Sequence, residues 1–364
     1  MAYNHLSSSQ ERRTNGRARN CVGIHSFDEL IERISALKTQ EEGYRCPDYL
    51  GKTKRSKSCS QDQTSKQANP TYNIETSDIA DLTSAEWREE MCEWSYTVID
   101  HCDIDREAVA ISFSFLDRFL AKMQCNRKQF KLAAMTALYL AVKLFSRKRI
   151  KAQSLAELSC GHFTAGNIEA MELIILDVLS WRTHPPTPVT FVYHIFLLLP
   201  PLTPQAESAI QDISTYLVEL SVCDYWFVTY KSSCVALASV VTAMSLLESS
   251  LGSSLNFHSE FQTRMSRVGL FEGDTIEKDI KDASARLKKM YLQSMECIQK
   301  IEVNTANTSP VSSASPGNVL NMTAAAFQEA HSFQPQAFSA AHRSTVCAKR
   351  APKKSVTQTK SDTP

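Results

Sequence analysis

Two charged residues interrupt apolar helical patterns, and their chemistry is that of ionic recognition. Lys143 lies near the end of KLAAMTALYLAVKLF, the most apolar helix that the pattern predicts. Either its stem covers apolar surface while its ammonium reaches water, or the ammonium lies at the rim of an apolar groove and binds a partner's carbonyl or carboxylate groups. Glu172 shares a helical stripe with Glu169 and Leu176, which is typical of a solvated face or of a partly apolar contact surface.

A second pair of charges stands among aromatic residues. Arg88 lies between Trp87 and Trp94, and Asp117 lies in the phenylalanine-rich segment ISFSFLDRFL. A charge surrounded by large apolar side chains is tolerated only when an opposite charge neutralises it. We therefore expect Arg88 and Asp117 to form a structural ion pair.

The residue patterns that carry catalysis, nucleotide binding or metal binding are missing. The ten glycines form neither GxGxxG nor GxxxxGK[ST], and the eleven cysteines and nine histidines form neither CxxC nor HExxH. An odd number of scattered cysteines, with no apolar leader at the N-terminus, favours a reducing compartment. A hydrolase site formed by a cysteine and a histidine distant in sequence stays open, but no motif supports one. We therefore expect no enzyme activity, no catalytic residue, no metal and no other cofactor.

The overall charge restricts the possible partners. Forty basic and 39 acidic residues give a net charge of +1, which argues against a nucleic-acid or membrane-surface binder that uses the whole chain. The longest apolar-leaning stretch, Cys234–Leu247, has 14 residues, whereas a membrane span needs about 20. We expect no membrane partner and no direct contact with nucleic acid.

The elements that must position these charges are helices throughout. Periodic apolar residues and capping signals predict one N-terminal helix and then two runs of five, and no hairpin signature appears. The predicted helices cover Ser26–Leu37, then Thr83–Ile99, Asp105–Lys122, Asn126–Phe145, Ala152–Ser159 and Thr164–Leu179, then Thr187–Leu198, Thr203–Val222, Lys231–Ser249, Ser259–Arg267 and Asp274–Ile301. Prolines 185, 186 and 188 separate the two runs.

The third helix of each run is apolar nearly all round and rich in small residues, which indicates a central helix surrounded by the other four. The fold class is therefore all-α, with two tandem five-helix folds and disordered N- and C-terminal tails. The expected divisions are a disordered arm (1–22), an N-terminal helix and connector (23–50), a flexible linker (51–82), the first fold (83–184), the second fold (185–302) and a disordered tail (303–364).

The tail carries residue patterns typical of regulated turnover and of transport to the nucleus. Ser309-Pro310 and Ser315-Pro316 have the form that proline-directed kinases favour, and Lys349-Arg350 with Lys353-Lys354 are compatible with nuclear import. All of these are also ordinary residues of a solvated tail. We expect the protein in the nucleus and the cytoplasm.

The segment between Trp87 and Pro188 resembles the cyclin box. The resemblance rests on WREEMCEW, FLDRFL, ALYLAVKL and MELIILDVLSW followed by RTHPPTP, all in register. The signature positions of the family fall on Arg88, Asp117, Leu132, Lys143 and Glu172. Residues 189–301 resemble the second cyclin fold by position and helix number only. The chain is thus similar to a divergent member of the cyclin family.

The resemblance implies a regulatory subunit that binds and activates a cyclin-dependent Ser/Thr protein kinase and so controls cell-cycle progression. Lys143 and Glu172 would hold backbone groups of the kinase's regulatory helix, and Leu144 and Leu176 would add apolar contacts. The family's substrate-docking patch would fall on Trp87, Met91 and Trp94. Glutamate stands there where the family has isoleucine, so we do not expect RxL-type substrates to dock.

Two observations refine these alternatives. Matching Ala141–Leu144 to Ala243–Leu246 places Ser245 where the first fold has Lys143, which favours a single kinase site.

Transcription initiation factors of the B type also use paired cyclin folds, to bind DNA. They need a zinc ribbon and a basic face, and the absence of CxxC disfavours them. Close approach of Lys143 and Glu172 on one surface would favour the kinase; a continuous basic face would favour DNA.

Overall fold

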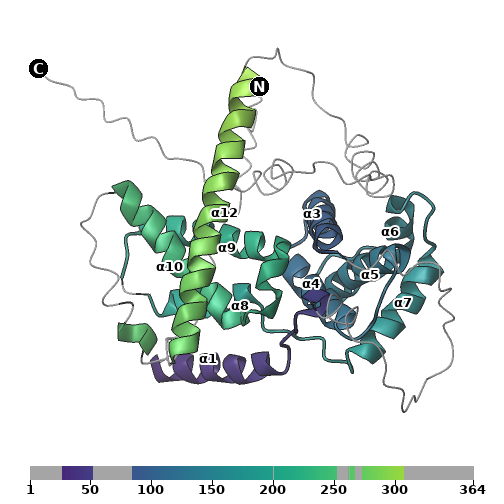
Figure 1. The fold of residues 1–364 in the computed structure, drawn as a ribbon, viewed down its shortest axis with the longest axis horizontal. Coiled ribbons are helices and arrows are strands. Elements are labelled where there is room, and N and C mark those ends of the chain that lie inside the picture. Colours follow the sequence, from purple (N-terminus) through teal and green to yellow (C-terminus); the bar gives the residue numbers. More distant parts are fainter. Residues whose placement is uncertain are drawn as a thin grey trace, which may run out of the picture.

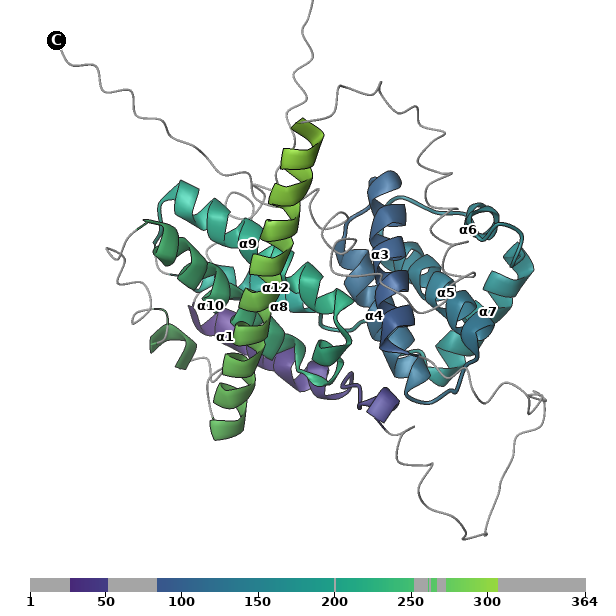
Figure 2. The same cartoon turned by 45° about the horizontal axis from the view of Figure 1, so that its top comes forward.

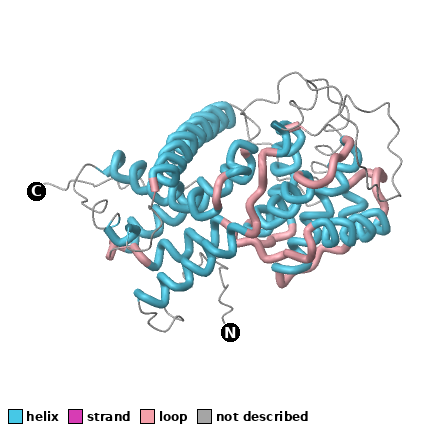
Figure 3. The backbone as a smooth tube through the Cα atoms, turned by 60° about the horizontal axis from the view of Figure 1, so that its bottom comes forward, coloured by secondary structure: helices cyan, strands magenta, loops and turns pink. Residues whose placement is uncertain are grey.

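The computed structural model describes residues 27–51, 84–199, 201–251, 261, 263–266 and 273–306, and these residues contain helices and loops but no strand (Figure 3). The first group of helices is α3 (Ala85–His101), α4 (Glu107–Leu120), α5 (Arg127–Phe145), α6 (Ala152–Leu158) and α7 (Ala165–Val178). The second is α8 (Pro188–Leu197), α9 (Pro204–Cys223), the 3-10 helix η2 (Tyr225–Thr229), α10 (Ser232–Leu251) and α12 (Asp274–Ala306), with α1 (Phe27–Glu42) before both.

Side-chain caps fix where several helices begin. Asn126 caps α5 and Thr164 caps α7, as the sequence predicts, and the structure adds a reciprocal capping box at each. The start of α3 differs from the prediction by one residue, because Ser84 rather than Thr83 accepts the backbone N–H of Trp87. Caps thus define most helix starts to within one or two residues.

Helix α5 is the centre of the first fold, as the small-residue pattern predicts. It contacts α3, α4, α6 and α7, and these helices surround it in Figures 1 and 2. Its alanines at 133, 134, 137 and 141 are at most 3% exposed and let the neighbouring helices approach closely. Both ends of α5 are therefore positioned by the packing of the whole fold.

Helix α10 has the same place in the second fold. It contacts α8, α9 and α12, and its residues Ala236, Ala238 and Ala243 are fully buried. The fourth helix of this run, expected over Ser259–Arg267, lies only partly within the described residues, of which 261 and 263–266 are helical. Helix α12 continues to Ala306, four residues beyond the boundary expected at 302.

Helix α1 comes first in the chain but packs on the second fold. Leu30 and Ile34 belong to the same hydrophobic core as Phe191 of α8, and α1 lies along the base of that fold in Figure 1. The Glu41 carboxylate accepts hydrogen bonds from the backbone N–H and the hydroxyl of Ser233 at the start of α10, at 3.0 and 2.6 Å. These contacts fasten the N-terminal segment to the second fold.

Within the described residues, no helix is long and apolar enough to cross a membrane. The arm expected over 1–22 and nearly all of the linker expected over 51–82 lie outside the described residues, as does the tail after 306.

The buried Glu41 carboxyl predicts a pH-dependent stability. Burial raises its pKa above the ordinary value of 4.5. Protonated Glu41 therefore contributes stability below this unfolded-state value, and that contribution is lost as the pH rises through the higher pKa of the folded state. We expect the free energy of unfolding, taken relative to that of Glu41→Gln, to fall in urea denaturation as the pH rises above the unfolded-state value of 4.5.

The matched control is Glu32→Gln, an exposed glutamate on the same helix. The change with pH should be larger for Glu41→Gln than for this control. Equal changes in the two variants would contradict the prediction for Glu41.

Candidate functional site

Lys143 and Glu172 meet at the surface shared by α5 and α7. The Lys143 Nζ donates to Glu172 Oε1 at 2.8 Å and to Oε2 at 3.1 Å, although the two residues lie 29 positions apart. The lysine side chain is 42% exposed and that of the glutamate 10%. The structure thus brings these two predicted site residues together, with the ammonium facing solvent and the carboxylate largely buried.

The local structure favours a cation at this place. Lys143 lies in the last turn of α5, where backbone carbonyls without helical partners carry partial negative charge. The hydrogen bond to Glu172 raises the pKa of the ammonium, so Lys143 is charged at neutral pH. The interpretation of Glu172 as part of a solvated face is wrong, because the carboxylate is covered and held by Lys143.

Exposed apolar side chains flank the pair. Leu144 is 45% exposed, Phe145 40% and Leu173 64%, and the ring of Phe145 packs edge-on against His184 at 5.1 Å. Sequence reasoning included Leu144 but missed Leu173. The signal for Leu173 was its place between Glu169 and Asp177 at intervals of four residues, which puts an apolar side chain on a charged helical stripe. We call Lys143, Leu144, Phe145, Glu172 and Leu173 the α5–α7 surface.

Leu176 does not belong to this surface. It is only 7% exposed and lies in the core of the first fold, because α7 packs against both α5 and α6. The expectation that Leu176 adds an apolar contact for a partner is therefore wrong for the chain in this conformation, and Leu173 is the exposed leucine of α7.

The predicted substrate-docking residues are mostly inaccessible. Met91 is 2% exposed and Trp94 is 5% exposed, both within the first core. Trp87 is partly buried and packs against Phe130 of α5, with the guanidinium of Arg127 over its ring. A docking role for Met91 and Trp94 is therefore contradicted, since α3 turns these side chains inward.

Arg88 and Asp117 lie together in the interior. The Nε and Nη2 of Arg88 donate to the two carboxylate oxygens of Asp117, both at 2.8 Å. The third nitrogen, Nη1, donates to the carbonyl of Val222 on α9 at 2.8 Å, and the hydroxyl of Tyr49 donates to Asp117 at 2.9 Å. Burial disfavours the charge on Arg88, but attraction to Asp117 outweighs it and raises the pKa of the guanidinium.

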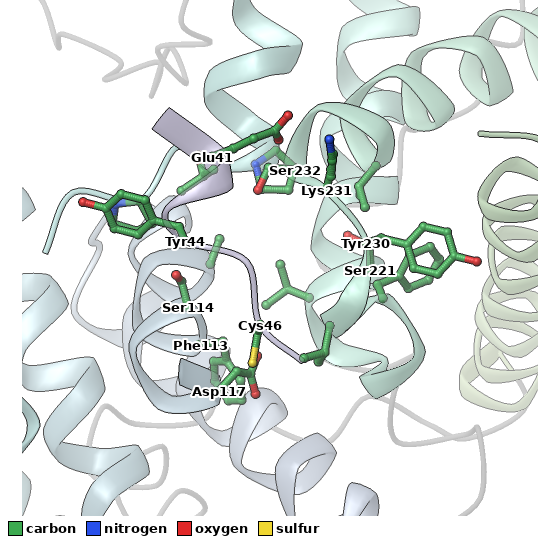
Figure 4. Close-up of a pocket in the computed structure, with 18 of the residues that line it drawn as sticks. Glu41, Tyr44, Cys46, Phe113, Ser114, Asp117, Ser221, Tyr230, Lys231 and Ser232 are labelled. Carbon is green, nitrogen blue, oxygen red and sulfur yellow. The ribbon is translucent and has the colours of Figure 1, made fainter. Parts of the chain in front are cut away.

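A cavity of about 120 Å³ lies beside this ion pair, where α1, α4 and the start of α10 converge. Figure 4 shows Asp117 and Cys46 on one side of it and Glu41, Lys231 and Ser232 on another. Its acidic groups are already engaged, Asp117 by Arg88 and Glu41 by Ser233. The cavity therefore lies at the junction of the two folds, and the carboxylates of Asp117 and Glu41 are already bound within it.

Among the described residues, no cluster of three or more histidine, cysteine or acidic side chains has the arrangement of a metal site.

In a comparison with known proteins, domain models match both folds of the chain. The model of the cyclin N-terminal domain matches residues 56–184, and that of the cyclin C-terminal domain matches residues 186–302. Rice cyclin-B2-1 (Oryza sativa subsp. japonica) is 29% identical over 157 residues, which cover 43% of this chain and 36% of that protein. The G2/mitotic-specific cyclin-2 of Medicago sativa is 28% identical over 174 residues, covering 48% of this chain and 50% of that protein.

The matched segments thus span about a third to a half of the length of these curated relatives. Among solved structures, a viral cyclin from herpesvirus saimiri aligns with a TM-score of 0.44 at 18% identity, over 57% of this chain and 89% of the viral one.

Two tandem all-helical folds, each packed around a central helix, with a lysine–glutamate pair on the first, define a protein of the paired cyclin-fold class. The two domain models together cover most of the chain, and the chain belongs to the cyclin family.

The Arg88–Asp117 pair predicts a large loss of stability when its charge balance is broken. Asp117→Asn keeps the shape of the side chain but leaves the guanidinium buried without a counter-charge. Removing one partner of a buried pair costs about 3–5 kcal/mol of unfolding free energy. Urea denaturation followed by circular dichroism measures this loss.

The control is Asp103→Asn, which removes the carboxylate of an exposed pair with Lys148. Its stability should stay close to that of the native chain. Equal effects of the two substitutions would show that the buried pair is not the junction's main electrostatic contact.

Proposed function

We propose that the chain is a regulatory subunit that binds and activates a cyclin-dependent Ser/Thr protein kinase. The observation that carries this proposal is the Lys143–Glu172 pair at 2.8 Å, with the exposed Leu144, Phe145 and Leu173 around it. Close approach of the pair on one surface is what separates the kinase hypothesis from the DNA hypothesis. Cyclin family proteins are regulatory subunits rather than enzymes, and we assign no catalytic residue.

The pair can bind a partner's backbone without breaking. The ammonium of Lys143 has three N–H donors, and each oxygen of Glu172 can accept more than one hydrogen bond. An incoming helix therefore offers a carbonyl to Lys143 and an N–H to Glu172 while the ion pair persists. The exposed leucines and Phe145 supply apolar area around this polar centre, which is the arrangement of a binding hot spot.

In this proposal, the chain activates the kinase by shifting the equilibrium between the inactive and active conformations of the kinase. Binding favours the conformation in which the regulatory helix of the kinase is turned inward, its Lys–Glu pair is complete and its activation loop is released. The chain supplies no reacting group and acts through the differential affinity of its α5–α7 surface for that conformation. The similarity to B-type and G2/mitotic-specific cyclins supports a role in the cell cycle.

We also propose that the protein occurs in the nucleus and the cytoplasm. Support comes from the basic pairs Lys349-Arg350 and Lys353-Lys354, which lie outside the described residues.

The central test is whether the pair holds the kinase. Affinity purification of the tagged chain first identifies the kinase that co-purifies. The double variant Lys143→Ala, Glu172→Ala should then bind that kinase more weakly by about 2–5 kcal/mol, because truncation leaves the partner's polar groups desolvated and unpaired. Calorimetric titration of the purified kinase measures the loss.

Lys288→Ala is the matched control, since Lys288 is exposed on α12 of the second fold. Thermal unfolding of all variants verifies that they fold. Unchanged kinase affinity in a folded double variant would remove the α5–α7 surface from the proposal.

The second fold predicts the stoichiometry. Ser245 stands on α10 at the position that matches Lys143 of α5, so the second fold has no equivalent ammonium. We expect one kinase molecule per chain in light scattering of the purified complex. Two kinases per chain would mean that the second fold carries a site of its own.

A further inference from the structure

A second cavity, of about 320 Å³, lies away from the Lys143–Glu172 pair and has a strongly one-sided charge. The chain after α1, the end of α4 and the turn after α7 line it. Four of its lining side chains are cationic and none is acidic; the cations are Arg45, Arg118, Lys122 and Arg182.

Three of these cations, Arg118, Lys122 and Arg182, are held by carbonyl oxygens rather than by carboxylates. Arg118 donates to the carbonyls of Ser114 and Arg182, both at 3.0 Å, Lys122 to that of Val178 at 2.7 Å, and Arg182 to that of Gly43 at 3.4 Å. Carbonyls orient the donors but do not neutralise the charge.

Arg45 is the only one of the four with an ion pair to a carboxylate within the described part of the chain. That pair, with Glu42, is long at 3.7 Å, and Glu42 is also bound by Lys231. The cavity therefore keeps a clear excess of positive charge.

Arg118 shows that this charge is poorly compensated. The residue is 8% exposed, and its guanidinium lies over the ring of Tyr44 at 4.8 Å. Burial lowers its pKa to about 10; the nearby charge of Arg182 acts in the same direction, and the charge of Asp117, which Arg88 already binds, acts in the opposite one. A buried cation without a counter-ion is unfavourable, so an anion that enters the cavity gains from neutralising it.

The backbone at one wall is held in an unusual conformation. Ser180 and Trp181, which follow α7, have φ angles of 53° and 58°, in the left-handed region that favours glycine. The N–H of Trp181 bonds to the carbonyl of Leu176, and that of Ser180 to Asp177. These two hydrogen bonds form the Schellman cap that ends α7. This turn directs the Arg182 carbonyl to Arg118 and the Arg182 side chain to Gly43.

We propose that this cavity binds the phosphoryl group of a phosphorylated serine or threonine in another protein. A phosphoryl group carries nearly two negative charges and three strong acceptor oxygens, which suit a lysine and several arginine forks better than a single carboxylate does. The choice of phosphoserine or phosphothreonine rests on the proposed function, because a Ser/Thr kinase partner makes these groups.

The geometry argues against the proline-directed serines of the chain's own tail. Helix α12 has 33 residues and is about 50 Å long, and α1 lies at its Asp274 end in Figure 1. Ser315 lies nine residues beyond Ala306 and reaches at most about 30 Å from it. A nucleic acid is disfavoured too, because it needs a track of basic side chains and the chain has a net charge of only +1.

The test uses the full chain without any kinase. A fluorescein-labelled short peptide with one phosphoserine between alanine and glycine is titrated by fluorescence anisotropy, beside the same peptide without phosphate. We expect at least tenfold weaker binding without the phosphate. The variant Lys122→Gln, Arg182→Gln should lose at least tenfold in affinity, whereas Lys288→Gln, Lys289→Gln on α12 should bind as the native chain does.

All four substituted positions are exposed, and thermal unfolding verifies that both variants fold. Equal binding of the two peptides, or equal losses in the two variants, overturns the proposal. The variant Lys143→Ala, Glu172→Ala should keep its affinity for the phosphopeptide, so failure of the kinase proposal and failure of this one give different results.

Competition separates the sources of phosphate. Unlabelled phosphopeptide should displace the probe at a concentration at least tenfold lower than inorganic phosphate does. Displacement by inorganic phosphate at the same concentration would show a free-anion site and overturn the role of a protein segment. Stronger displacement by an oligothymidylate than by the phosphopeptide would assign the cavity to nucleic acid and also overturn it.

Discussion

The bidentate contact between Arg88 and Asp117 is the interaction on which the arrangement of the molecule depends. Every nitrogen of the guanidinium has a partner: two bind the carboxylate, and the third reaches the carbonyl of Val222 in the second fold. Tyr49, from the segment after α1, binds the same carboxylate. Burying two charges is expensive, and this geometry offsets the expense because the remaining polar atoms also find partners. One ion pair thereby joins the first fold, the second fold and the N-terminal segment.

The α5–α7 surface follows from that junction through α4. Asp117 lies on α4, which packs along α5, and α7 packs on another side of α5. The end of α5 therefore occupies a fixed place relative to α7, and Lys143 meets Glu172 without a flexible loop between them. A recognition surface on two packed helices is rigid, so little conformational freedom is lost when a partner binds.

Local chemistry explains why so many helices could be predicted. Asn126 and Thr164 carry capping side chains that act within three residues, so their helix starts are readable from sequence. The Lys143–Glu172 pair could be predicted only from the family register, since no local rule joins residues 29 positions apart. The burial of single side chains was harder to predict. Leu176 and Met91 were assigned to surfaces, because helical periodicity shows which residues share a face but not whether other helices cover that face.

Contacts of Glu41 with Ser233 join residues 192 positions apart, and this separation has a consequence for synthesis on the ribosome. Because the ribosome adds about 5–20 residues per second, the start of α10 is synthesised about 10–40 s after the end of α1. During that time the whole first fold emerges and can form, while Leu30 and Ile34 lack the core that covers them in the finished chain. Helix α1 thus exposes apolar side chains in the nascent chain, and completion of the second fold is the event that buries them.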